Sequence, residues 1–250
     1  MSRLWPEHLR AAVFPDGAWL CRRNGQEVGR FDGRLDGAGD LAMVLEALLA
    51  QRHPGRARIE LMVSDRLARI VHLPWQDGLA NEAQRTAYGR ACLERTGLDL
   101  RGDWVLQAAF RHFARSGIAY ALPRSLVQGA RDVLAAHGVQ LASILPLSGA
   151  AYWRYRSGLG RQRSIIVLEE PGRVSALLIE AGKYVGIQVQ PAGVQPEDAV
   201  RRLLHAVDAL FPGVQRVLYW SASQASASEG VLREALPEAA VEVLDMMWWF

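Results

Sequence analysis

The residues that could carry catalytic chemistry are scattered along this 250-residue chain. Its six histidines, at positions 8, 53, 72, 112, 137 and 205, form no pair with one another or with cysteine at the spacing of metal ligands. Ser64-Asp65 and Ser148-Gly149 lack the G-x-S-x-G context of a hydrolase nucleophile, and no phosphate-binding glycine motif of the Walker A or G-x-G-x-x-G type occurs. The sequence therefore predicts no catalytic residue and no metal site.

Four carboxylates could in principle form acid–base pairs, namely Asp99, Asp103, Glu169 and Glu170. Charged side chains are almost never fully buried unless they are paired. We therefore expect all four to be solvated charges on loops.

A supersecondary unit occurs twice, about 155 residues apart. The apolar runs 11–14 and 165–168 each end in turn residues, Pro15-Asp16-Gly17 in the first copy and Glu169-Glu170-Pro171-Gly172 in the second. Further turns at Asn24-Gly25 and Ala181-Gly182 predict a three-stranded meander in both copies.

Both meanders are followed by a helix and a strand. Apolar residues at i, i+3, i+4, i+7 and i+8 predict an amphipathic helix over 38–52, which ends at Pro54-Gly55. The second helix ends at Pro212-Gly213, and strands 57–63 and 217–221 follow. The repeat predicts an α/β protein with two lobes and a cleft between them.

The segment between the copies has a different order of elements. Helices are expected at 79–95 and after Pro123, and strands at 67–73, 104–111, 118–122 and 139–145. This strand-helix-strand-strand-helix-strand order predicts a small inserted α+β subdomain. The expected division is a first lobe over 1–73, an insert over 74–146 and a second lobe over 147–250.

Composition limits the function classes. The net charge is +3, and the basic residues are Lys183 and 28 arginines out of a total of 29. These are spread along the chain with acids nearby, which does not favour a nucleic-acid surface. Cys21 and Cys92 fall at predicted core positions, as expected for a protein of a reducing cytoplasm. No apolar run reaches the roughly 20 residues of a membrane span, and we expect neither a signal peptide nor a transmembrane segment.

The run 63–75 ends a strand with Leu73-Pro74-Trp75 just before the predicted insert. This run resembles the strand-turn-strand of the PilM-like proteins and of the cytoplasmic domain of GspL. The Trp104 strand, the Pro123 helix and the strand 141–146 are also placed as in that group. The chain thus resembles the actin-like ATPase (ribonuclease H-like) superfamily, and the resemblance implies a duplicated actin-like ATPase fold.

The resemblance also implies a function. Proteins of this group are cytoplasmic bacterial scaffolds of type IV pilus and type II secretion machines. We expect a non-catalytic adaptor, recruited to the inner membrane by a partner. That partner would be an inner-membrane assembly protein with a short cytoplasmic tail, or the assembly ATPase. Homo-oligomerisation stays open. Because the chain ends at Phe250 without a membrane span, it looks like a free-standing PilM-type subunit.

In the same superfamily an acidic residue and a glycine at the first turn of each lobe hold the phosphates and Mg²⁺. The matching positions are Asp16 and Gly17 in the first lobe, and Glu169, Glu170 and Gly172 in the second. The first turn lacks the usual Ser or Thr, Pro171 removes an N–H, and Tyr219-Trp220-Ser221 lacks the glycines that approach adenosine. We expect no cofactor; the alternative is an ATPase that binds ATP and Mg²⁺ and whose nucleotide state gates assembly.

Two segments are candidates for binding a partner. In PilM-like proteins the groove near the crossing Leu73-Pro74-Trp75 receives a short peptide of a membrane partner, and Trp75 could anchor it. Alternatively, Trp75 packs the subdomain junction. The second segment is the end of the chain, Met246-Met247-Trp248-Trp249-Phe250. Its side chains cannot all face inward from a strand, so we expect Trp248, Trp249 and Phe250 to cover their own lobe, a partner or a membrane interface.

Overall fold

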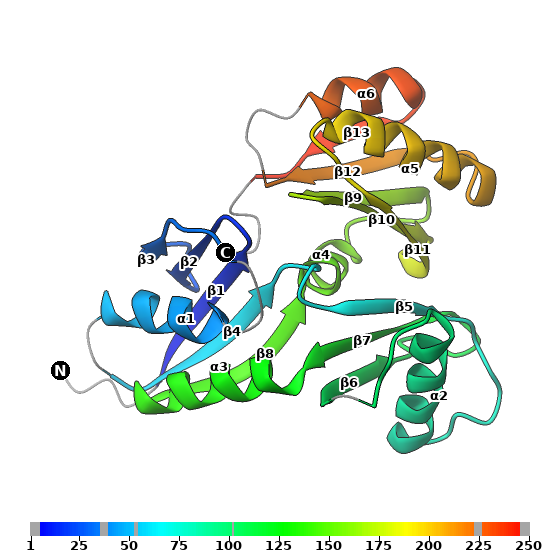
Figure 1. The fold of residues 1–250 in the computed structure, drawn as a ribbon. Coiled ribbons are helices and arrows are strands. Elements are labelled where there is room, and N and C mark those ends of the chain that lie inside the picture. Colours follow the sequence, from blue (N-terminus) through cyan, green and yellow to red (C-terminus); the bar gives the residue numbers. More distant parts are fainter. Residues whose placement is uncertain (1–5, 36–39, 53–54, 102, 223–226, 246–250) are drawn as a thin grey trace.

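The computed structural model describes residues 6–35, 40–52, 55–101, 103–222 and 227–245. In Figure 1 the first lobe lies at the lower left, the insert at the lower right and the second lobe at the top. Among the described residues, no helix is long and apolar enough to cross a membrane.

The first lobe is built on a five-stranded sheet in the order β3-β2-β1-β4-β8. The first three strands form an antiparallel meander, while β4 and β8 run parallel to β1. Its elements are β1 (Glu7–Phe14), β2 (Gly17–Arg22), β3 (Glu27–Phe31), α1 (Asp40–Ala50), β4 (Ala57–Val63), α3 (Arg124–Ala136) and β8 (Val139–Pro146).

The second lobe repeats this arrangement in a sheet of order β11-β10-β9-β12-β13. Again an antiparallel meander is extended by two parallel strands. Its elements are β9 (Arg163–Glu170), β10 (Arg173–Glu180), β11 (Lys183–Pro191), α5 (Pro196–Leu210), β12 (Arg216–Ser221), α6 (Ser228–Ala235) and β13 (Ala240–Val243). The equal strand order and directions show that the chain holds the same fold unit twice.

The insert is a three-stranded antiparallel sheet of order β5-β7-β6, covered on one side by α2. Its elements are β5 (Arg69–Leu73), α2 (Glu82–Arg95), β6 (Trp104–Ala109) and β7 (Gly117–Pro123). Asn81 and Gln84 form a capping box at the start of α2, which fixes where this helix begins.

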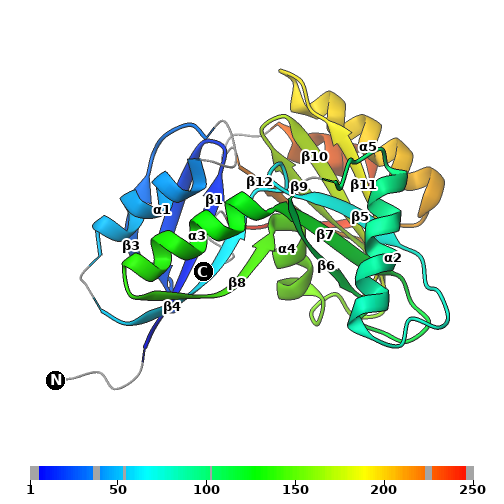
Figure 2. The same cartoon turned by 60° about the horizontal axis from the view of Figure 1, so that its bottom comes forward.

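The expected insert boundary of 74–146 is corrected by the strand pairing. The strand predicted over 139–145 was expected to belong to the insert, but as β8 it pairs in parallel with β4 of the first lobe. α3 packs beside α1 on one face of that sheet, as Figure 2 shows. α3 and β8 are therefore the end of the first repeat, equivalent to α6 and β13. By sheet membership the insert comprises residues 69–123.

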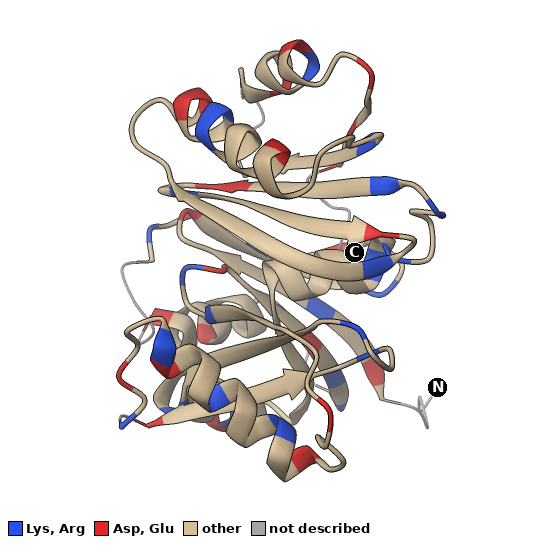
Figure 3. Cartoon of the chain, turned by 90° about the vertical axis from the view of Figure 1, so that its right-hand side faces the viewer, with Lys and Arg blue, Asp and Glu red and all other residues tan. Residues whose placement is uncertain are grey.

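Each lobe has an outer core between its sheet and its helices. In α1 the apolar residues at helical spacing, from Leu41 to Leu49, are all buried against the sheet. α5 and α6 cover the second sheet in the same way. Basic and acidic residues are interspersed on the helices, as Figure 3 shows.

A third core lies between the lobes. α4 (Leu147–Tyr155) runs between the inner faces of the two sheets, as Figure 1 shows. Leu147, Ala150 and Ala151 of this helix pack in one cluster with Phe14 of the first lobe and Trp220 of the second. The two lobes are thereby joined through a shared core.

Candidate functional site

The first turn that the resemblance assigns to phosphate lies between β1 and β2. Asp16 is exposed there, whereas Gly17 is buried. A Cβ at Gly17 would lie 3.1 Å from the carbonyl oxygen of Phe31, so the neighbouring strand β3 favours glycine at this position. Packing accounts for Gly17 without any ligand.

The second turn differs from the sequence expectation. Glu169 and Glu170 were expected to be solvated, but they are the last residues of β9 and are only 4% and 3% exposed. β9 is a central strand with neighbours on both sides, and its end lies where the lobes meet. Asp99 and Asp103 are exposed, as expected.

Polar partners surround the first of these buried carboxylates. The hydroxyls of Tyr219 and Ser221 each donate to Glu169 at 2.9 Å. Gly172 follows at the turn with φ +80°, in the left-handed region that favours glycine. Hydrogen bonding and turn geometry explain these residues as parts of the fold.

Glu170 lies at the interlobe junction, which ties the loop after β4 to the turn after β9. The backbone N–H of Asp65 donates to Glu170 Oε2 at 3.2 Å, and Arg173 donates to the carbonyl of Asp65 at 3.1 Å. Both the backbone N–H and the hydroxyl of Ser148, in the first turn of α4, donate to Asp65 Oδ1 at 3.1 Å. Residues from both lobes and from α4 thus converge on Asp65.

The two carboxyl groups at this junction influence each other. Burial, and then the charge of Asp65, raises the pKa of Glu170 to about 8. Burial also raises the pKa of Asp65, against the opposing effects of Arg173 and Ser148. Asp65 Oδ2 and Glu170 Oε1 have no hydrogen-bond partner among the described residues. The junction thus favours at least one neutral carboxyl group near neutral pH.

Aromatic side chains fill the space beside this junction. The rings of Phe14 and Trp220 are 5.1 Å apart, and Trp19 contacts Phe14 edge-on at 6.0 Å. Phe14 immediately precedes the first turn, and Trp220 lies on β12, the strand after which the resemblance would place an adenosine-binding turn. Both are almost fully buried.

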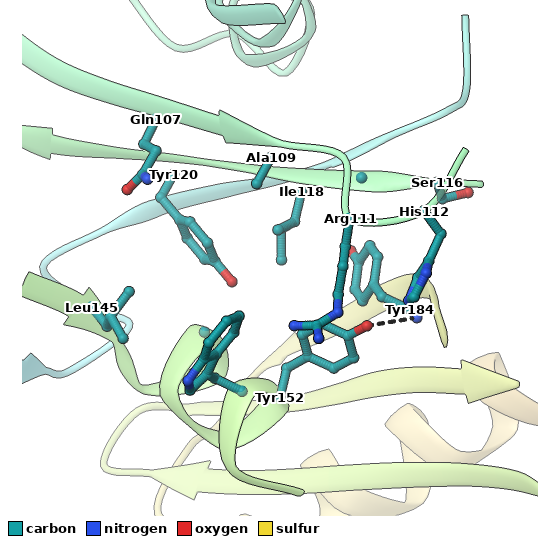
Figure 4. Close-up of a pocket in the computed structure, with 13 residues that line it drawn as sticks. Gln107, Ala109, Arg111, His112, Ser116, Ile118, Tyr120, Leu145, Tyr152 and Tyr184 are labelled. Atoms are coloured by element: carbon teal, nitrogen blue, oxygen red, sulfur yellow. Dashed lines mark hydrogen bonds between the residues drawn. The ribbon is translucent and has the colours of Figure 1, made fainter. Parts of the chain in front are cut away.

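An open cavity of about 220 Å³ lies on the other side of α4. Its walls come from the uncovered side of the inserted sheet, the β6–β7 loop, the end of β8, α4 and the start of β11. Most of its lining is aromatic or aliphatic, as Figure 4 shows. We call this cavity the α4 groove; its lining residues are Gln107, Ala109, Arg111, His112, Ser116, Gly117, Ile118, Tyr120, Leu145, Gly149, Tyr152, Trp153 and Tyr184.

Tyrosines shape the α4 groove. A Cβ at Gly149 would lie 2.9 Å from the hydroxyl oxygen of Tyr120, so glycine in α4 makes room for this ring. Burial raises the pKa of both Tyr120 and Tyr184, which keeps their hydroxyls neutral. The backbone N–H of Tyr184 donates to the Tyr152 hydroxyl at 3.4 Å. These contacts hold the rings as a preformed wall.

Trp75 borders a second cavity, of about 430 Å³, which we call the Trp75 pocket. Its indole N–H donates to Asp77 at 2.9 Å, and its ring contacts Phe110 and Phe113 at 5.7 and 5.1 Å. His112 lines both this pocket and the α4 groove, so the two adjoin.

The other residues of the Leu73-Pro74-Trp75 crossing have separate places. Leu73 is buried in the core of the insert, and Pro74 is exposed. The carbonyl of Pro74 accepts a hydrogen bond from Tyr88 at 3.1 Å. Of the three residues of this motif, Trp75 is the one that lines the Trp75 pocket. Trp248, Trp249 and Phe250 lie outside the described residues, so their expected contacts stay a prediction.

Sequence reasoning missed most of the α4 groove. Tyr120, Tyr152 and Tyr184 come from three separate elements, so no local motif joins them. A signal did exist for the junction, because Ser64-Asp65 and Glu169-Glu170 stand at the ends of strongly apolar strands. Within the described part of the chain, no group of three or more His, Cys, Asp and Glu side chains could hold a metal.

Comparison with protein-family models and with curated protein sequences finds no match. Solved structures do match. A protein of unknown function with an actin-like ATPase fold from Bacteroides thetaiotaomicron has a TM-score of 0.65 at 12% identity, over 95% of this chain and 90% of that one.

Two further solved structures come from secretion and pilus machinery. A chain of the PilM–PilN type IV pilus biogenesis complex has a TM-score of 0.66 at 12% identity, over 97% of this chain and 89% of that one. The cytoplasmic domain of EpsL, an inner membrane component of the type II secretion system of Vibrio cholerae, has a TM-score of 0.55 at 10% identity, over 97% and 92%. At such identities the likeness shows the fold, and it confirms the fold class expected from sequence: this chain has the duplicated actin-like ATPase fold.

Proposed function

We propose that this chain is a non-catalytic adaptor of a bacterial cell-envelope assembly of the type IV pilus or type II secretion kind. It would reside in the cytoplasm and bind the cytoplasmic segment of an inner-membrane partner. The PilM–PilN complex and the EpsL domain share its fold over nearly the whole chain, which supports this class of assembly. The observation that carries the proposal is the α4 groove, a preformed cavity beside the insert.

The groove has the chemistry of a peptide site. Its walls are mainly aromatic and aliphatic, with a few polar groups such as Gln107 and Arg111 to fix orientation. The adjoining Trp75 pocket would take a second anchor residue of the same segment. An extended peptide with two large apolar side chains suits these adjoining cavities, since such anchors dominate the energy of binding interfaces.

The space between the two phosphate-type turns supports an adaptor better than a nucleotide enzyme. Phe14 and Trp220 pack against each other there, and Glu170 is bonded to the first lobe. ATP would have to displace these buried contacts. The alternative is an ATPase that binds ATP and Mg²⁺ and whose nucleotide state gates assembly. An experiment must distinguish this ATPase from an adaptor.

The direct test first searches the genes that flank the one for this chain for a single-span membrane protein with a short cytoplasmic segment. A fluorescent synthetic peptide of its cytoplasmic segment is titrated with the full chain, and anisotropy reports binding. We expect saturable binding that weakens at least about 30-fold in Trp75→Ala or Tyr152→Ala, since truncating an interface anchor costs about 2 kcal/mol or more. Met43→Ala, an exposed apolar residue on α1, is the matched control. Absence of binding, or equal weakening by the control, would refute this docking role.

Two further titrations address the alternatives. Calorimetry with ATP and Mg²⁺ should give no heat of binding, and ATP should leave the melting temperature unchanged. A bound nucleotide at 100 times its dissociation constant would add about 2.7 kcal/mol. Micromolar binding that is lost in Asp16→Ala would favour the ATPase. Binding of an assembly ATPase instead of the peptide would reassign the partner.

A further inference from the structure

A surface of basic and aromatic side chains borders the α4 groove. The β6–β7 loop, the end of α4 and the β10–β11 turn contribute to it. Figure 3 views the molecule from the side on which the second lobe approaches the insert, and several turns and strand ends there are coloured as basic. We call this surface the basic-aromatic rim and define it as Arg111, Phe113, Arg115, Trp153, Arg156 and Lys183.

The two aromatic residues of the rim are unusually exposed. Phe113 is 85% exposed and Trp153 is 59% exposed, whereas the other described tryptophans and phenylalanines are buried or half-buried. Phe113 stands at the tip of its loop, just before Ala114, which has a positive φ of 55°. Exposure of a large aromatic ring to water is unfavourable, and a binding partner that covers the ring would remove this cost.

The positive charges of the rim lie close together and are not neutralised. Arg111, Arg115, Arg156 and Lys183 form no ion pair with any acidic residue that the structure describes. His112 lies among them: burial, and then the charges of Lys183 and three arginines, lowers the pKa of this histidine. The nearby Arg163 is different, because Glu180 pairs with it at 3.0 Å.

Two of these arginines also hold Trp153 in place. The guanidinium of Arg156 lies 3.7 Å from the centre of the indole ring, and that of Arg111 lies 4.9 Å away. Such cation–π contacts orient the ring while leaving most of it exposed. The rim is thus a fixed array of cations and aromatic rings.

We propose that the basic-aromatic rim contacts the anionic surface of a lipid bilayer. Tryptophan is enriched at membrane–water interfaces, and clustered basic residues are attracted to anionic headgroups. An acidic protein segment would satisfy the charges, but interface anchors normally fill pockets, whereas Phe113 protrudes. This surface goes beyond the proposed docking function, because lipid binding needs no partner peptide.

The test is co-sedimentation of the full chain with phosphatidylcholine vesicles that contain or lack phosphatidylglycerol. We expect binding only to the anionic vesicles, and weaker binding as ionic strength rises. Each basic side chain near an anionic leaflet contributes about five-fold to affinity. The double variant Arg115→Glu/Lys183→Glu should therefore bind anionic vesicles at least about 25-fold more weakly than the unaltered chain. Phe113→Ser should lose less affinity for these vesicles than the double variant, and its binding should depend on salt as that of the unaltered chain does.

The matched control is Arg58→Glu/Arg131→Glu, which makes the same change in net charge on β4 and α3 of the first lobe. This control should lose much less affinity for anionic vesicles than the rim variant. Three results would overturn the proposal: no binding of the unaltered chain to anionic vesicles, equal losses in the rim and control variants, or rim-dependent binding of a polyglutamate peptide without vesicle binding. The assay contains no partner peptide, so its failure leaves the peptide titration unaffected.

Discussion

The molecule brings separate segments together in two places, and they are filled very differently. At the interlobe junction, Asp65, Glu170 and Ser148 share hydrogen bonds, and Phe14 and Trp220 close-pack beside them. At the α4 groove, the insert and the second lobe leave a cavity of about 220 Å³ between aromatic walls. The resemblance to the actin-like ATPases would place a nucleotide in the first region, whereas a cavity lies in the second.

The same helix serves both regions. The first turn of α4 is fixed at the junction through Ser148, while Tyr152 and Trp153 near its other end line the groove. Because the first turn of α4 is held in a buried hydrogen-bond network, the helix positions Tyr152 and Trp153 firmly in the groove. The comparison indicates that the contact between the lobes organises the structure, and it supports the proposal that a ligand binds in the groove.

The largest expected effect comes from Trp220→Ala. This side chain is 1% exposed and packs on Phe14 across the lobes. Truncating a buried Trp costs about 3–5 kcal/mol, which for a chain of this size lowers the melting temperature by roughly 6–20 °C. Thermal unfolding followed by circular dichroism measures it.

Trp153→Ala is the contrasting variant at the groove. Because Trp153 is largely exposed, its loss should cost less than about 1 kcal/mol, mostly from its cation–π contacts. Similar losses of stability in Trp220→Ala and Trp153→Ala would contradict the contrast between a close-packed junction and an open groove.

The next effect is pH dependence at the junction, tested by Glu170→Gln. The folded-state pKa of Glu170 is raised from 4.5 to about 8, so the folded state keeps a proton that the unfolded state releases. The free energy of unfolding should therefore fall as pH rises from about 4.5 to 8, and be insensitive to this group outside that window. At about 1.4 kcal/mol per pKa unit, a shift from 4.5 to about 8 sets an upper bound of about 5 kcal/mol on the change across this window.

Urea unfolding at pH 5 and pH 8.5 measures this effect as a difference between variants. Glutamine keeps the shape of the neutral carboxyl group, so Glu170→Gln should flatten the pH dependence and be the more stable protein at pH 8.5. Glu82→Gln, at an exposed position on α2, is the control and should leave the dependence as it was. Equal pH profiles for all three proteins would show that Glu170 does not hold a proton in the folded protein near neutral pH.

The sequence predicted the repeated elements well because turn chemistry is local. Gly17, Gly25 and Gly172 stand at turns of the meanders, and the apolar spacing from Leu41 to Leu49 identified α1. Pairing is not local, which is why the strand predicted over 139–145 was assigned to the insert. Its apolar pattern shows a strand but not which neighbour it pairs with, and only the equivalence of α3–β8 with α6–β13 settles its place.

The site was harder to predict than the fold. Burial of Glu169 and Glu170 depends on the contact between the lobes, which no spacing in either copy encodes. Trp75 was found from sequence because it belongs to a short motif, yet Phe110 and Phe113, which pack on it, were not. A groove assembled from β7, α4 and β11 becomes visible only when these elements are placed together.

A smaller effect is expected from Gly117→Ala, at a residue that lines the α4 groove. A Cβ at this position would clash with the carbonyl oxygen of Ala109 and lie 2.7 Å from the ring of Phe110. Overpacking of this kind costs about 1–3 kcal/mol, and it should also displace the β6–β7 loop and weaken peptide binding. Gly129→Ala in α3 is the matched control: its nearest neighbour would be 3.7 Å away, so helix propensity should stabilise it by up to about 1 kcal/mol. Both changes are read from urea unfolding, and destabilisation by both would contradict the steric explanation.

The smallest effect isolates the insert itself. The side chain of Asn81 accepts from the backbone N–H of Gln84 at 2.9 Å, and the Gln84 side chain accepts from the N–H of Asn81 at 3.2 Å. Removing such a cap in Asn81→Ala should cost about 1 kcal/mol. Because α2 contacts β5, β6 and β7 and lies away from the interlobe core, hydrogen exchange should quicken in the insert and stay unchanged in β9 and β12. Faster exchange in those strands as well would show that the insert and the lobes unfold as one unit, and the groove would then share the stability of the junction.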